Sequence, residues 1–89
     1  MNRDLKEFES IWRYYYNLLP INNYEFDLYM RIMNKIRTNN VNFSSNEKTS
    51  FIDLLRVMSH TIYNYKKENE EEKMDRELDC CYRIKQRLL

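Results

Sequence analysis

The sequence of 89 residues contains no glycine and no alanine, and its only proline is Pro20. Phosphate-binding loops, dinucleotide fingerprints and nucleophile elbows all need glycine where the backbone turns tightly or approaches a ligand closely. The missing glycine therefore excludes several classes of enzyme at once.

A strong net charge is also missing. Lysine and arginine number 15 and the acidic residues 14, so the formal net charge is +1. Proteins that bind nucleic acid usually carry a strongly basic face. The balanced charge therefore disfavours nucleic acid as the partner without excluding it.

Long apolar segments are absent as well. No stretch approaches the roughly 18 apolar residues of a membrane span, and the N-terminal Met-Asn-Arg-Asp leads into no secretory signal. We therefore expect no membrane association and a cytoplasmic location in the producing or infected cell.

Cysteine is scarce, and the two that exist, Cys80 and Cys81, are adjacent. Neighbouring cysteines rarely bridge, and a structural zinc site needs about four ligands at wider spacing. We expect reduced thiols, no metal and no cofactor, with Cys81 in the core and Cys80 at its edge. A redox role for the pair stays open.

Six amino acids with AT-rich codons (asparagine, tyrosine, isoleucine, lysine, methionine and phenylalanine) make up 42 of the 89 residues. This bias is our reason to expect an AT-rich genome, such as that of a bacteriophage, another virus or a low-GC bacterium. For a phage gene, an accessory protein that inhibits or modulates a host protein is a typical product.

Apolar residues recur at helical spacing along four segments. The pattern predicts helices over about 3–19, 22–37 and 46–65, and a fourth that begins near residue 70. Pro20 ends the first, because a residue before proline is held out of helical geometry. Asn22 with Glu25 and Ser44 with Glu47 are capping boxes for the second and third.

The segment 38–46 is rich in asparagine and serine, which favour turns. We interpret it as a loop, and we expect Val41 and Phe43 to fold inward and anchor it.

The junction between the last two segments decides the fold. Nine residues separate Tyr65 from Met74, which is about half a turn of offset, so one straight helix would move its apolar stripe to the opposite side. We favour a turn near residues 68–70. The fold expected is all-α, a small antiparallel bundle of four helices in a single domain over 1–89. The alternative is a three-helix core with a long projecting C-terminal helix.

The second segment carries an unusually wide apolar arc of roughly 200°. Phe26, Leu28, Met30 and Ile32 all belong to it. Either this helix is central or part of the arc meets a partner, and a homodimer is one such arrangement.

Six residues are candidates for a partner-binding surface. Tyrosine, tryptophan and arginine dominate binding hot spots, and they cluster away from the predicted core on the first and third segments. The candidates are Arg13, Tyr14, Tyr16, Ile52, Arg56 and Tyr63. The competing interpretation places these side chains at the core margin or against a second neighbouring helix.

Two further polar features have ordinary explanations. His60 has no partner at helical spacing, so we interpret it as a solvated surface histidine. Four cations align on the fourth segment, Lys73, Arg76, Arg83 and Arg87. We expect them to be neutralised by acids one turn earlier, including Asp79 for Arg83.

No catalytic residues are predicted, so we interpret the chain as a non-enzymatic protein that acts through protein-protein binding. The main alternative is a small nucleic-acid-binding transcriptional regulator, in which the second and third helices present Lys48 and Arg56 to DNA. A polar pocket built from Arg13, Arg31 and Arg56 is the least favoured hypothesis.

Overall fold

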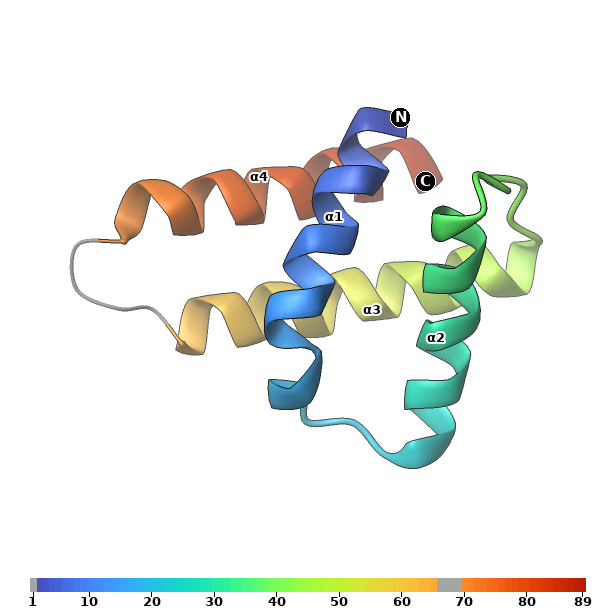
Figure 1. Ribbon diagram of the computed structural model, residues 1–89, viewed down its shortest axis with the longest axis horizontal. Helices are drawn as coiled ribbons and strands as arrows, with labels where there is room; N and C mark the ends of the chain where they lie inside the picture. The colour runs from blue at the N-terminus through green and yellow to red at the C-terminus, as the bar shows by residue number, and fades with distance from the viewer. Residues whose placement is uncertain (1, 66–69) are drawn as a thin grey trace.

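The computed structural model describes residues 2–65 and 70–89 and shows a protein built from helices (Figure 1). The described residues form α1 (Asn2–Tyr15), a short 3-10 turn η1 (Tyr16–Leu18), α2 (Asn23–Arg37), α3 (Ser45–Asn64) and α4 (Glu71–Leu88), with no strand among them. The all-α prediction of four helices is confirmed.

The helices form two antiparallel pairs that cross each other. In Figure 1, α1 crosses the near side of α3 and α4, and α2 runs in the opposite direction to α1 across the near side of α3; α3 and α4 also run in opposite directions. α1 packs against all three other helices, whereas α2 packs mainly on α1 and α3. Because α4 lies along α3, the alternative with a projecting C-terminal helix is wrong. Most of the predicted turn falls on residues 66–69, outside the described residues.

The ends of the helices follow the sequence signals. In α2 the Asn22 side chain accepts a hydrogen bond from the Glu25 backbone N–H, and the Glu25 carboxylate accepts one from the Asn22 N–H. Ser44 and Glu47 make the same reciprocal pair at α3. The first helix is shorter than predicted, because α-helical geometry ends at Tyr15 and continues only as the 3-10 turn.

The end of α2 shows how the chain manages without glycine. Asn39 adopts a φ of 59°, the left-handed conformation usually taken by glycine after a helix. The N–H groups of Asn39 and Asn40 then bond to the carbonyls of Ile36 and Lys35 at 3.1 and 2.9 Å. Asparagine tolerates this conformation better than most residues, so the helix ends in a Schellman-type cap.

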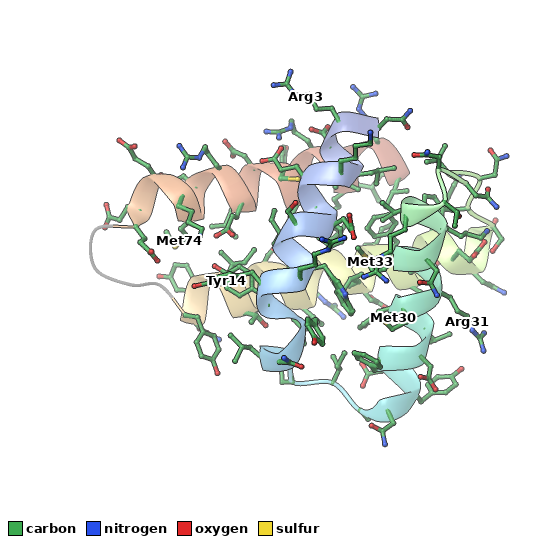
Figure 2. All side chains as sticks on the ribbon, in the orientation of Figure 1. Arg3, Tyr14, Met30, Arg31, Met33 and Met74 are labelled. Atoms are coloured by element: carbon green, nitrogen blue, oxygen red, sulfur yellow. The ribbon has the colours of Figure 1, made fainter. Side chains whose placement is uncertain are left out.

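The wide apolar arc of α2 is accommodated inside the molecule. Tyr29, Ile32, Met33 and Ile36 are buried, and Phe26, Leu28 and Met30 are partly buried against the core. Figure 2 shows Met30 and Met33 on the α1 side of α2 and Arg31 on the opposite side. The arc is wide because α2 packs on two helices, so it requires no external partner.

Two predictions about burial need correction. Val41 is exposed, and only Phe43 folds inward, with its ring 5.4 Å from that of Phe51. Cys80 is fully buried rather than at the edge, because α1 covers it and its Sγ donates to the Asp4 carbonyl at 3.4 Å.

Candidate interaction surface on α3 and α4

A groove runs between α3 and α4, with a volume of about 510 Å³. We call it the α3–α4 groove. Only these two helices line it, through Leu55, Arg56, Ser59, His60 and Tyr63 of α3 and Leu78, Asp79, Cys81, Tyr82 and Lys85 of α4.

The groove lies on the outer side of the α3–α4 pair. At about 100° per residue, Arg56 and Tyr63 sit roughly 140–160° round α3 from the buried Met58. Met58 belongs to the core that α1 and α2 cover. Arg56 and Tyr63 therefore point away from that core, whereas α1 and α2 lie on the near side of α3 in Figure 1.

An apolar floor and aromatic edges shape the groove. Leu55 and Cys81 are buried, and Leu78 is partly buried against the core. Tyr63 from α3 and Tyr82 from α4 are 66% and 62% exposed. A tyrosine side chain combines an apolar ring with a polar hydroxyl, so it suits a surface that is hydrated in the free protein and desolvated when a partner binds.

The lining residues carry one more positive than negative formal charge, since they include Arg56, Lys85 and Asp79. The Arg56 Nη2 lies 3.3 Å from the Asp53 carboxylate, but both side chains are at least half exposed, so this pair is weak. Within the described ranges, Lys85 makes no ion pair.

Of the six candidate residues, the structure brings Arg56 and Tyr63 together in this groove. Ile52 lies on the same helix but is partly buried against the core. Two of the three third-helix candidates therefore share the groove, and Ile52 is not among its lining residues.

The three candidates on α1 and its following turn lie elsewhere and have partners within the chain. Arg13 pairs with Glu9 at 2.8 Å, the Lys73 ammonium sits 4.3 Å from the Tyr14 ring, and Tyr16 stacks on Trp12 at 5.9 Å. Tyr14 leaves α1 on the side where Met74 of α4 lies (Figure 2). The six residues do not form a single surface.

Tyr82, Leu78 and Lys85 complete the groove and were missed by sequence reasoning. They repeat at spacings of four and three, one position beyond the core row of Glu77, Cys81 and Ile84. This second row at helical spacing was the feature of the sequence that could have identified these three residues. His60 is exposed, as predicted for a surface histidine, and lies at the groove edge.

One cation of the α4 stripe, Arg83, has different partners from the one predicted. Arg83 does not pair with Asp79 but reaches α1, where it bonds to Asp4 at 3.2 Å and Glu7 at 3.4 Å. Together with the Lys73–Tyr14 contact, this pairing fixes α1 to α4.

No group of three potential ligands that could hold a metal ion occurs among residues 2–65 and 70–89. Burial raises the pKa of Cys80 and Cys81 to about 12, so both thiols are protonated at neutral pH.

Arg31 and Arg56 line different grooves, so the polar pocket considered for them is not formed. No described helix is long and apolar enough to cross a membrane.

Comparison with protein-family models, with curated protein sequences and with solved structures finds no match to this chain.

Proposed function

We propose that this protein is not an enzyme and acts by binding another protein through the α3–α4 groove. The observation that carries the proposal is the pair of exposed tyrosines, Tyr63 and Tyr82, at the edges of an apolar floor. Tyrosine and arginine are enriched in binding hot spots, where they fill pockets and exclude water.

Support also comes from a contrast with two exposed tyrosines outside the groove, Tyr14 and Tyr16, although Tyr24 and Tyr65 are exposed outside the groove without such contacts among the described residues. Tyr14 and Tyr16 already stack with neighbouring residues or lie against a cation within the chain. No ring or cation contact of Tyr63 or Tyr82 is found within the described part of the chain. Their apolar surface is therefore available to a partner.

The mode of action would be occlusion or scaffolding. Both edges of the groove are helices packed into the core, so little conformational entropy is lost when a partner docks. A rigid face of this kind can cover a functional surface of its target. Inhibition or modulation of a host protein by a phage or viral accessory protein is the role that fits this mode and the AT-rich composition.

Site-specific photo-crosslinking tests the proposal. A benzophenone amino acid is placed at position 63 or 82, and the protein is irradiated in extracts of its native cells. The matched control is position 24, because Tyr24 is 72% exposed but lies on α2. We expect one discrete protein adduct from positions 63 and 82 and none from position 24.

Other products would contradict the proposal. Equal adduct yields from positions 24, 63 and 82 would mean that the partner does not bind preferentially in the α3–α4 groove. A product of twice the chain mass would indicate a homodimer through this face, and an adduct with nucleic acid would favour the transcriptional regulator.

The length of one loop is a reason to rank that regulator second. The loop between α2 and α3 covers residues 38–44, whereas the connection in a helix-turn-helix usually has 3–4 residues.

A further inference from the structure

We infer that the segment bound in the α3–α4 groove is an amphipathic helix with acidic residues beside its apolar stripe. The inference rests on the proposed function and adds the chemistry of the partner. Two antiparallel helices side by side leave a groove that a third helix can fill by ridge-into-groove packing.

The backbone of the groove favours a helix over an extended strand. Every wall of the groove is α-helix, whose N–H and C=O groups are already bonded within α3 and α4. An extended segment would find no sheet edge to pair with, and its own backbone groups would be buried without partners. A helical segment satisfies its own backbone and offers only side chains.

The length of the groove sets the size of the occupant. The lining runs from Leu55 to Tyr63 along α3 and from Leu78 to Lys85 along α4. At 1.5 Å per residue, these spans are about 10–12 Å. Two to three turns of an incoming helix therefore suffice, with apolar residues at i, i+3 or i+4, and i+7.

The charges of the groove indicate which residues should flank the apolar stripe of the bound helix. Lys85 lacks an acidic partner in the described ranges, and Arg56 can exchange its weak contact with Asp53 at little cost. His60 adds a polar side chain with ring nitrogens at the groove edge. Carboxylates on the incoming helix complement these groups. A second copy would instead present the same net positive lining, since a two-fold dimer joins identical patches.

A peptide pair tests the inference. Two fluorescent 18-residue peptides share one leucine stripe and differ only in their flanking residues, glutamate or lysine, and binding is followed by fluorescence anisotropy. We expect the glutamate peptide to bind about fivefold more tightly or better, the effect of one or two exposed ion pairs. The preference should shrink as salt is added.

Charge reversal of the groove provides the direct check. The double variant Arg56→Glu and Lys85→Glu should reverse the preference in favour of the lysine peptide. The matched control, Arg3→Glu and Arg31→Glu, makes the same change in net charge at two side chains that point into solvent (Figure 2). It should keep the preference of the unmodified protein.

The outcomes separate the two proposals. If Tyr63→Ala with Tyr82→Ala weakens both peptides but the two bind equally, the acidic partner is overturned and the groove stands. If the tyrosine variants change nothing, peptide binding occurs elsewhere and both proposals fail. If neither peptide binds at millimolar concentration, the helical occupant is overturned, and the crosslinking result alone decides the proposed function.

Discussion

The Tyr15 hydroxyl donates a 2.9 Å hydrogen bond to the Glu77 carboxylate, which lies 62 residues later in the sequence. Both residues are buried, and the bond joins α1 to α4. Burial raises the pKa of Tyr15, and the bond to Glu77 raises it further, so the phenol stays protonated and can donate. Glu77 is the only charged residue among those that the structure describes as buried.

Removing this hydroxyl should destabilise the protein. In Tyr15→Phe the ring still fills its place, but the Glu77 carboxylate loses its buried donor. We expect the free energy of unfolding to fall by about 1–3 kcal/mol, the usual cost of leaving a buried polar group without its bond. Urea unfolding followed by Trp12 fluorescence measures the change, because Trp12 is buried in the same core.

Tyr14→Phe is the matched control, since it removes the same atom from the adjacent, half-exposed tyrosine. We expect a change within about 0.5 kcal/mol, typical of a surface substitution. Equal losses in the two variants would show that the Tyr15–Glu77 bond contributes nothing specific.

The two cysteines should be chemically inert in the folded protein. Their raised pKa of about 12 leaves almost no thiolate at pH 8, and both side chains are enclosed. Thiolate is the reactive form, so iodoacetamide should label Cys80 and Cys81 only at the rate at which the protein opens. Mass spectrometry of timed samples, with and without urea, checks this expectation.

A Ser10→Cys variant supplies an exposed thiol as an internal reference. It should be labelled rapidly while the native pair is not. Rapid native labelling of Cys80 or Cys81 would support a reactive role and contradict their burial.

The cap of α3 should make stability depend on acidic pH. A hydrogen bond from Lys35 at 2.8 Å, followed by one from the Ser44 backbone N–H, lowers the pKa of Glu47 to about 2 from an ordinary value near 4.5. The contribution of Glu47 is therefore complete above pH 4.5 and is lost as the pH falls towards 2. Urea midpoints measured from pH 7 to pH 2.5 should fall across this window.

Glu47→Gln isolates the charge, because glutamine can still complete a capping box. The variant should be less stable than the unmodified protein at pH 7, and the difference should narrow by pH 2.5. Glu25→Gln changes the equivalent capping residue of α2, which has no ion pair within the described residues. If the difference in stability between Glu47→Gln and the unmodified protein stayed constant from pH 7 to pH 2.5, the lowered pKa of Glu47 would be contradicted.

The loop before α3 should depend on one aromatic residue. Phe43 packs on Phe51 and lies 5.8 Å from the Lys35 ammonium, whereas Val41 is exposed. Phe43→Ala should reduce stability by on the order of 2 kcal/mol, below the range for a fully buried phenylalanine. Val41→Ala should have little effect, and thermal unfolding compares the two. Similar melting temperatures for the two variants would contradict this ranking.

The sequence was most informative where a signal is local. Asn22 with Glu25 and Ser44 with Glu47 identified two helix starts, because each capping box needs only four consecutive residues. Helical spacing likewise identified most of the core. Such patterns depend on backbone geometry within one or two turns, which the sequence records directly.

Contacts between helices were not predictable in the same way. Nothing near Cys80 indicates that α1 covers it, and the acid one turn before Arg83 suggested the wrong partner. The exposed or engaged state of the surface residues was equally hard to predict from the sequence. Tyr14 and Tyr63 look equivalent in sequence, and only the packing of α1 against α4 shows that one is engaged with Lys73 while the other faces solvent.

The position of α1 across the other helices has a consequence for synthesis. Its contacts with α4 join residues 62 to 79 positions apart, through Tyr15–Glu77, Asp4–Cys80 and Asp4–Arg83. A ribosome-bound chain that lacks α4 leaves one flank of α1 uncovered, and closing such long loops is slow relative to local helix formation. The native packing of α1 should therefore form only after α4 has been synthesised, and apolar side chains of α1 should stay exposed to chaperones until then.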